Sequence, residues 1–246
     1  MLRVLTYNVR RCLGLDGRLS TRRIAGIIAS CNPDIIALQE LDVGRARSMG
    51  RDQAHEIAME LGMEHFHFHP ALKVLEEEYG DAIITAGRST LMKAGPLPGL
   101  DGRPRLEPRG ALWVKVELQG QTVNILNTHF GLGRAERQAQ ARALLGGDWL
   151  GHEACREPVI LLGDFNSLPR GRVYGQITRR LRDGHLAAEE RSGPRRTFPS
   201  PLPMFRIDYI FVDPRLRVRR VRTLANPRTR LASDHLPLFA DIELAP

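Results

Sequence analysis

The sequence predicts an α/β (α+β) fold built on mixed β-sheets, and three observations favour this class. Many short apolar runs are rich in β-branched residues, which is typical of strands. Helical segments separate some of these runs, whereas tight turns such as residues 118–121 join others. Helical connections favour parallel strand pairs and tight turns favour antiparallel pairs, so we expect both kinds.

Ten apolar runs are predicted as strands, and four segments between them as helices. The strands are expected at residues 2–8, 34–39, 64–69, 81–86, 111–118, 121–128, 158–163, 206–212, 216–224 and 236–242. Ser20 or Thr21 can cap a helix that ends near Ser30. The other helices are expected at residues 52–61, 133–149 and 172–181.

Three segments rich in glycine, proline and arginine are predicted as loops, namely Gly44–Arg51, Leu91–Arg109 and Glu189–Phe205. They are longer than a simple connection requires, which favours a role in contacting substrate. We therefore expect loop arginines such as Arg45, Arg47 and Arg103 to contribute to substrate affinity.

The length and composition favour one domain spanning residues 1–246, with 42% hydrophobic residues and no break in composition. The chain starts with a strand-like segment rather than a leader peptide, and its apolar runs are shorter than a membrane helix. We expect a cytoplasmic monomer without a transmembrane segment. The distant Cys12, Cys31 and Cys155 suggest neither a disulfide framework nor a zinc site.

The formal net charge is +8, and the excess comes mainly from arginine. Arginine binds phosphate oxygens through its planar fork, so an anionic partner is favoured. Charge alone does not separate nucleic acid from anionic phospholipid. A general arginine-rich composition is the alternative interpretation.

A set of polar residues stands where the predicted strands end. Carboxylates, amides and imidazoles are therefore expected to gather at one edge of a sheet. Such oxygen ligands hold Mg²⁺ or Mn²⁺, imidazoles transfer protons and arginine neutralises phosphate charge, so the pattern favours hydrolysis of a phosphate ester. The set is Asn8, Glu40, Arg109, Asn127, His129, Asp164, Asn166, Asp208, Asp234 and His235.

Six short motifs occur in the order TYN, LQE, NTH, GDFN, RIDYIFV and SDH. Together they resemble the endonuclease/exonuclease/phosphatase superfamily over residues 2–238. The resemblance implies a four-layer α/β sandwich, in which helices flank two packed mixed sheets, and a phosphoesterase that depends on Mg²⁺ or Mn²⁺. The NTH motif, with His129, is similar to the deoxyribonuclease, sphingomyelinase and deadenylase branches.

The resemblance assigns the metal chiefly to Glu40, with Asn8 and Asp234 nearby. Asp208 is expected to orient His235, which takes a proton from the attacking water. Asp164 is the rival base, and the sequence does not decide between Asp164 and His235.

The resemblance also implies that His129, Asn166 and Arg109 stabilise the transition state. His129 would contact the scissile phosphate or protonate the leaving oxygen, with Asn127 supporting it. Asp81 departs from the family pattern, in which asparagine is common at this point. An extra carboxylate near phosphate leaves the choice of substrate and the number of metals open.

Three functions stay open from the sequence. A phosphodiesterase acting on DNA or RNA is favoured, and a phosphodiesterase or phosphatase acting on a phospholipid or its headgroup is the alternative. A non-catalytic module that binds anions is the third.

Three other features have simpler interpretations. His65, His67 and His69 lie on one face of a predicted strand and are expected to be surface residues rather than metal ligands. Residues 215–222 are expected to form a solvated arginine face. Phe198 and Phe205 suit core packing and base stacking equally.

Overall fold

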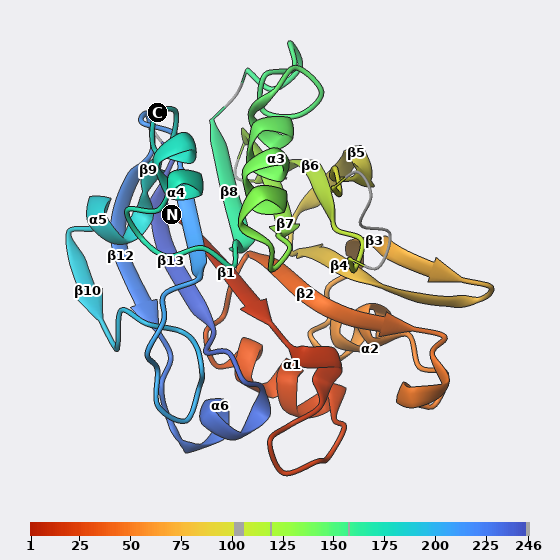
Figure 1. The fold of residues 1–246 in the computed structure, drawn as a ribbon. Coiled ribbons are helices and arrows are strands. Elements are labelled where there is room, and N and C mark those ends of the chain that lie inside the picture. The colour runs from red at the N-terminus through yellow and green to blue at the C-terminus, as the bar shows by residue number, and fades with distance from the viewer. Residues whose placement is uncertain (101–105, 119, 157, 245–246) are drawn as a thin grey trace.

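The centre of the protein is a pair of β-sheets packed face to face (Figure 1). The computed structural model describes residues 1–100, 106–118, 120–156 and 158–244. In spatial order, the first sheet contains β10 (Glu190–Ser192), β12 (Arg217–Thr223), β13 (Leu238–Glu243), β1 (Leu2–Asn8), β2 (Ile35–Val43), β4 (Glu77–Thr85) and β3 (His65–Val74). The second contains β5 (Arg88–Pro96), β6 (Gly110–Leu118), β7 (Gln121–His129), β8 (Val159–Asp164), β11 (Asp208–Val212) and β9 (Arg182–Asp183).

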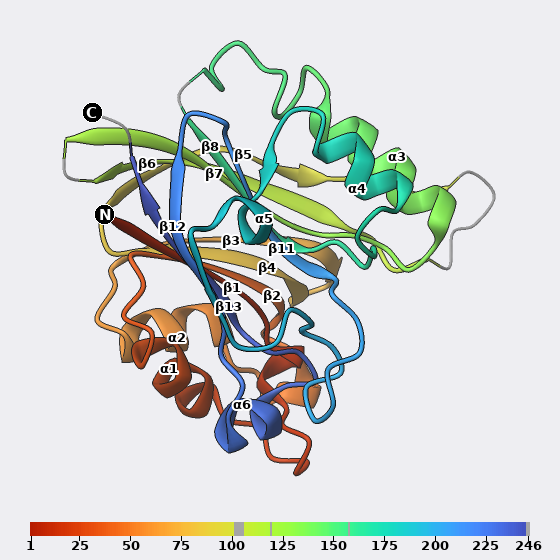
Figure 2. The same ribbon diagram turned by 90° about the vertical axis from the view of Figure 1, so that its left-hand side faces the viewer.

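Helices form the two outer layers (Figure 2). The first sheet is covered by α1 (Thr21–Ala29), α2 (Gln53–Glu60) and α6 (Pro227–Ala232), and the second by α3 (Arg134–Leu145) and α4 (Arg172–Ile177). The short α5 (Gly184–Ala187) contacts β11 and β12, and the chain makes 3₁₀ turns at η1 (Arg10–Cys12) and η2 (Ala46–Ser48). Each sheet mixes parallel and antiparallel pairs. The predicted four-layer sandwich of two mixed sheets is confirmed.

The central strands are buried on both faces. Val4 and Ile35 point toward the other sheet, whereas their neighbours Leu5 and Ile36 point toward the helices. Successive side chains of a strand alternate between faces, so a strand covered on both sides needs apolar residues at nearly every position. This double burial explains the continuous apolar runs in the sequence.

The predicted loop Leu91–Arg109 is wrong in its first part, because the strand β5 extends to Pro96. It lies at the edge of the second sheet and is largely exposed, so its sequence lacks a strong apolar pattern. The third predicted loop likewise contains the short strand β10. Two helices end earlier than predicted, at Leu145 and Ile177. Residues 101–105 of the loop, with Arg103, lie outside the described residues.

The prediction that the three histidines of β3 are surface residues is wrong for His67 and His69. His67 Nε2 lies 3.0 Å from Ser89 Oγ of β5, and the ring of His69 lies against Gly110. Both side chains are half-buried against the second sheet, and burial lowers the pKa of both imidazoles. Only His65 is an exposed residue of the kind predicted.

Cys12, Cys31 and Cys155 are buried, and none of them forms a disulfide within the described residues. Over the part of the chain that the structure describes, no helix has the length and apolar character needed to cross a membrane.

Candidate active site

The central strands of both sheets deliver polar residues to one region. β1 runs parallel to β2, and β7 runs parallel to β8, so the carboxyl ends of each pair lie together. β11 is antiparallel to β8, and its first residue, Asp208, lies opposite Asp164. The strand ends therefore meet where the two sheets face each other.

Asn8 joins the two sheets at the centre of this region. Its Nδ2 donates to Oε1 of Glu40 at 2.9 Å on the first sheet and to Oδ2 of Asp164 at 3.1 Å on the second. The backbone N–H of Arg10 donates to its Oδ1 at 3.1 Å, and because an N–H only donates, this contact fixes the amide orientation. In this arrangement Asn8 holds two carboxylates in place through its nitrogen.

Glu40 lies in a β-bulge of β2. The pairing of β2 with β4 shifts between Leu38 and Leu41, and Glu40 has a φ of 62°, in the left-handed region that favours glycine. Such a backbone costs a non-glycine residue on the order of 1–3 kcal/mol and is found mainly at functional sites. The bulge brings the carboxylate of Glu40 to Asn8.

His235 and Asp208 form the pair that the sequence predicts. The Nδ1 of His235 lies 3.0 and 3.2 Å from the two carboxylate oxygens of Asp208, while its Nε2 lies 3.7 Å from Oδ2 of Asp164. The Phe198 ring packs on the imidazole with a centroid distance of 4.8 Å. Burial alone would lower the pKa of His235, but the charges of Asp208 and Asp164 outweigh it and raise the pKa to about 10.

His129 has a cation as its partner. Its Nδ1 lies 2.9 Å from Nη1 of Arg109, and because a guanidinium only donates, Nδ1 accepts and the neutral ring carries its proton on Nε2. This Nε2 lies 3.4 Å from Oδ2 of Asp164 and 3.2 Å from Nδ2 of Asn166. Burial, together with the charges of Arg109 and His235, lowers the pKa of His129 well below its ordinary value.

Asp164 stands between the two histidines and is fully buried. Its Oδ1 accepts the backbone N–H of Asn166 at 2.9 Å, and the side chain of Asn166 donates to the Phe130 carbonyl at 2.8 Å. Burial raises the pKa of Asp164 to about 7; the charge of Asp208 adds to this rise and that of His235 opposes it. Asp164 thus shares the site with a second carboxylate and two imidazoles.

Arg109 and Asp81 lie beside this group. Arg109 is 7% exposed, pairs with Glu107 Oε1 at 2.7 Å and leaves its Nε without a hydrogen-bond partner among the described residues. Burial raises the pKa of Asp81 to about 8, although the charge of Arg109 opposes this rise. A largely uncharged Asp81 at neutral pH, next to an arginine, removes much of the repulsion expected toward phosphate.

Asn127 has a different role from the expected support of His129. Its Oδ1 accepts the Gln39 amide at 2.8 Å, and its Nδ2 donates to two backbone carbonyls of the first sheet at 2.9 Å. Asn127 therefore ties the sheets together, and Arg109 fixes the ring of His129.

The loop before β13 holds Asp234 and His235 against β1. The Ser233 hydroxyl donates to the Asn8 carbonyl at 2.8 Å and accepts the N–H of His235 at 3.2 Å. Asp234 Oδ2 lies 3.7 Å from Nε of Arg10. Ser233 and Arg10 are supporting residues that the sequence interpretation omits, although Ser233 belongs to the SDH motif.

One group of side chains in the described residues has the arrangement of a metal site. Asp164, Asp208 and His235 are buried and offer ligand atoms that all lie within 4.8 Å of one another. Glu40 is linked to Asp164 through the amide of Asn8. The predicted metal residue Glu40 and the predicted catalytic residues Asp164 and Asp208 are thus brought together.

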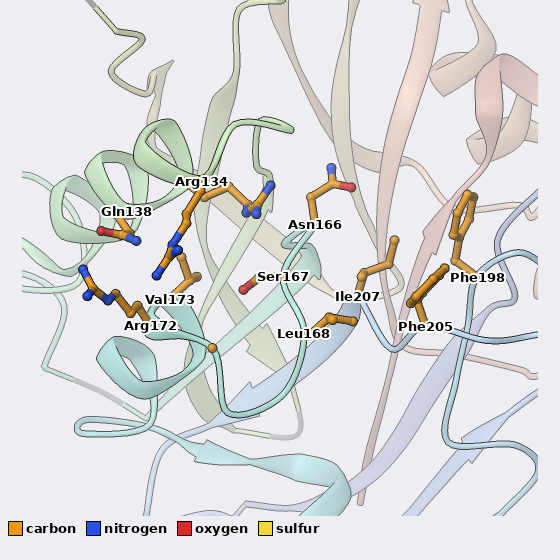
Figure 3. A pocket seen from close by; sticks show the side chains of 12 residues that line it. Arg134, Gln138, Asn166, Ser167, Leu168, Arg172, Val173, Phe198, Phe205 and Ile207 are labelled. Carbon is orange, nitrogen blue, oxygen red and sulfur yellow. The ribbon is translucent and has the colours of Figure 1, made fainter.

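A pocket of about 450 Å³ opens beside Asn166 (Figure 3). It is lined by Arg134, Arg137 and Arg172 and by Phe198 and Phe205, and Figure 3 shows Arg134 and Arg172 at the end opposite the two phenylalanines. These arginines are not among the site residues predicted from the sequence. A signal was present, because Arg134 and Arg137 are three residues apart and share one face of the predicted helix.

Comparison with protein families matches residues 5–235 to the Endonuclease/Exonuclease/phosphatase family. The uncharacterized protein YbhP of Escherichia coli strain K12 is 26% identical over 254 residues, which cover 98% of this chain and 96% of YbhP.

Two solved structures illustrate the similarity of fold. The mannosyl-6-phosphatase of Bacteroides thetaiotaomicron VPI-5482 aligns with a TM-score of 0.81 at 21% identity, covering 99% of this chain and 100% of its own. The catalytic domain of human Nocturnin, with a bound sulfate anion, aligns with a TM-score of 0.74 at 24% identity, covering 98% and 94%.

Proposed function

Because the chain belongs to the endonuclease/exonuclease/phosphatase family and is therefore a hydrolase of phosphate esters, we propose that it is a divalent-metal-dependent phosphodiesterase. The observation that carries this proposal is the pair of buried histidines whose Nε2 atoms face one oxygen of Asp164. One histidine is bonded to a cation and the other to an anion, so Nε2 of the neutral His129 is a hydrogen-bond donor, whereas Asp208 stabilises a proton on His235.

The acidic residues of the site, of which Asp164 and Asp208 are buried and Glu40 is partly buried, fit a divalent cation. Glu40, Asp164 and Asp208 offer hard oxygen atoms, and the raised pKa of Asp164 reflects a carboxylate buried beside another carboxylate. We assign Glu40 as the principal ligand, with Asp164 held next to it by Asn8 and Asp234 nearby. A bound Mg²⁺ or Mn²⁺ polarises a phosphoryl oxygen and offsets its charge.

His235 is the proposed general base. Both oxygens of Asp208 accept from its Nδ1, so Nε2 is the nitrogen that can take a proton from the attacking water. Asp208 also stabilises the imidazolium that results. Asp164 is the alternative base: a carboxyl with a pKa of about 7 suits proton transfer near neutral pH, whereas His235, with a pKa of about 10 in the metal-free protein, is unprotonated mainly in alkaline solution.

His129 is the proposed donor to the phosphate. Its proton is on Nε2, which faces the site, and Arg109 keeps this tautomer by donating to Nδ1. His129 can then donate to a phosphoryl oxygen or to the leaving oxygen, with Asn166 beside it as a second donor. The positive charge of Arg109 stabilises the negative charge that develops there.

A phosphodiester of DNA or RNA is the substrate class that we favour, because a strand offers further phosphates to the arginines that line the pocket beside the site. A second candidate, a phospholipid or headgroup phosphodiester, is favoured by exposed apolar side chains at the pocket. Leu168 and Phe205 line it and are 50% and 42% exposed, and such residues can enter a lipid interface.

Hydrolysis of bis(p-nitrophenyl) phosphate with Mg²⁺ or Mn²⁺ tests the proposal. We expect Glu40→Gln to abolish most activity and to weaken Mn²⁺ binding in calorimetry while Tm is retained, because the change removes a ligand charge and little volume. Glu190→Gln, which removes an exposed carboxylate paired with Arg220, is the matched control. Plasmid DNA, RNA, vesicles of anionic phospholipid and inositol phosphates extend the assay. No hydrolysis of any of these with either metal would contradict the proposal.

A further inference from the structure

The pocket beside Asn166 has a cationic end built from two helices. Arg134 and Arg137 lie in the first turn of α3, and Arg172 is the first residue of α4. All three line the pocket, and Figure 3 shows Arg134 and Arg172 at the end away from Phe198 and Phe205. Arg134 and Arg172 are exposed, whereas Arg137 is half-buried.

No carboxylate forms an ion pair with these three arginines within the ranges of the chain that the structure describes. The guanidinium of Arg137 donates to the carbonyls of Gly131, at 3.3 Å, and Leu132. The adjacent Glu136 is buried and bonds instead to the N–H of Gly133 and the amide of Gln140. A cluster of cations without an anion, partly removed from water, is stabilised by an anionic ligand.

Several arginines elsewhere on the surface are paired with carboxylates. On β12, Arg217 and Arg219 pair with Glu189, and Arg220 with Glu190, at 2.5 to 2.9 Å. In the predicted substrate loops, Arg47 binds the buried Asp42 through two bonds of 2.6 and 2.9 Å.

Arg45 of the same loops pairs with Glu77 at 3.5 Å. These contacts neutralise the positive charge within the chain. The pocket arginines differ, because their charge remains available to a ligand.

The pocket is continuous with the candidate active site. Asn166 lines the pocket, and its Nδ2 lies 3.2 Å from Nε2 of His129. Phe198 lines it as well, and its ring packs on the imidazole of His235. A substrate that reacts between the two histidines therefore extends into the pocket.

We propose that Arg134, Arg137 and Arg172 bind a second phosphate of the substrate while the scissile phosphate lies between His129 and His235. The inference rests on the proposed phosphodiesterase function. A pocket of about 450 Å³ accommodates a unit of nucleotide or glycerol phosphate size. A neighbouring phosphate of this kind occurs both in nucleic acid and in a bisphosphorylated headgroup.

Matched pairs of chromogenic substrates test the second-phosphate site. One pair is the p-nitrophenyl ester of thymidine 5′-phosphate with and without a 3′-phosphate. The other is the p-nitrophenyl ester of glycerol 3-phosphate with and without a 1-phosphate. We expect kcat/KM to be at least about tenfold higher for the bisphosphate of one pair, because bonds to a charged group contribute more than neutral ones.

The double variant Arg134→Ala/Arg172→Ala should reduce this preference toward one, because kcat/KM falls for the bisphosphate ester more than for its partner without the second phosphate. Arg137 is kept, because it holds the loop that precedes α3. Arg217→Ala/Arg220→Ala removes the same charge from β12 and should keep the preference. A preference in the thymidine pair alone identifies nucleic acid, and in the glycerol pair alone a headgroup.

Equal kcat/KM within both pairs, or an equal preference in wild type and Arg134→Ala/Arg172→Ala, would overturn the inference. Calorimetry in EDTA gives a readout without turnover, comparing thymidine 3′,5′-bisphosphate with thymidine 5′-monophosphate. Tighter binding of the bisphosphate by wild type alone supports the arginine site even if no ester is hydrolysed, in which case the proposed activity fails. Hydrolysis of the esters without any preference for a bisphosphate supports the proposed activity and contradicts the second-phosphate site.

Discussion

His129 and His235 lie on opposite sides of Asp164 and have opposite electrostatic surroundings. Both are buried, and both direct Nε2 toward the same carboxylate oxygen, at 3.4 and 3.7 Å. Arg109 contacts Nδ1 of His129, whereas Asp208 contacts Nδ1 of His235. The pKa of His129 is lowered and that of His235 is raised. Burial lowers the pKa of both rings, and the charge of the bonded partner adds to this effect at His129 and opposes it at His235.

Replacing the carboxylate that the two histidines share should have the largest effect. We expect Asp164→Asn to lower kcat by about 10³ or more, because His129 and His235 both lose the anion between them and the metal loses an oxygen ligand. The amide keeps the shape of the side chain, so Tm should change little. Steady-state kinetics on bis(p-nitrophenyl) phosphate measure the effect, and a rate within about tenfold of wild type would remove Asp164 from the chemistry.

Asp208→Asn changes only the His235 side of the comparison. Loss of the anion should lower the pKa of His235 and reduce kcat by about 10² to 10⁴, the range for loss of a proton-transfer group. The rate needs an unprotonated His235, so kcat/KM should rise with pH through a limb above the ordinary value of about 6.5, and the variant should shift this limb downward.

The pH profile of the rate separates the two possible bases. Asp213→Asn, which alters an aspartate paired with Arg215, is the control and should leave the limb in place. If the limb also stays in place in Asp208→Asn and in His235→Ala, Asp164 rather than His235 activates the water.

Arg109→Gln changes the electrostatic surroundings of His129. The variant keeps a donor for Nδ1 but removes the positive charge, so the pKa of His129 should rise toward its ordinary value. We expect roughly a tenfold loss of kcat/KM, since a neutral donor stabilises developing charge less well. NMR titration of the His129 ring measures the pKa. An unchanged titration would mean that burial, not Arg109, keeps this imidazole neutral.

The smallest effect is on the pH dependence of folding stability in metal-free protein. For His129 the lowered pKa means that the unfolded chain binds a proton more readily, so stability is lost as pH falls below about 6.5. For His235 the raised pKa gives stability that is present below about 6.5 and lost as pH rises toward about 10. His129→Gln should flatten the acid side of the stability profile, and His235→Gln the alkaline side.

Urea unfolding in EDTA at several pH values measures these slopes. The same slopes in wild type and in both variants would show that the two histidines do not differ in this way.

The fold could be predicted where strands are buried on both faces. The runs at residues 2–8 and 121–128 match β1 and β7 almost residue for residue, because helix-facing and sheet-facing positions are both apolar. The exposed edge strand β5 carries no such pattern, and α6 is a short helix of six residues beginning at Pro227. An element that buries few side chains needs few apolar residues, so its sequence shows no clear apolar pattern.

The sequence predicts which residues gather near the ends of the strands. It does not predict all of the hydrogen bonds that these residues make with one another. The Asp208 and His235 pair follows from the family resemblance of the RIDYIFV and SDH motifs. The partner of His129 does not follow, since whether Arg109 or Asn127 reaches its ring depends on how the sheets pack. The link that Asn8 makes between Glu40 and Asp164 is likewise a product of tertiary packing.

That link makes the candidate site sensitive to a partial opening of the molecule. Glu40 and Asp164 belong to different sheets, and the amide of Asn8 connects them across the interface. A fluctuation that separates the sheets breaks this connection while the hydrogen-bond ladders within each sheet stay intact. Sub-global openings of this kind require less free energy than complete unfolding. Enzyme activity should therefore decline at lower denaturant concentration than circular dichroism, and so report on the docking of the two sheets.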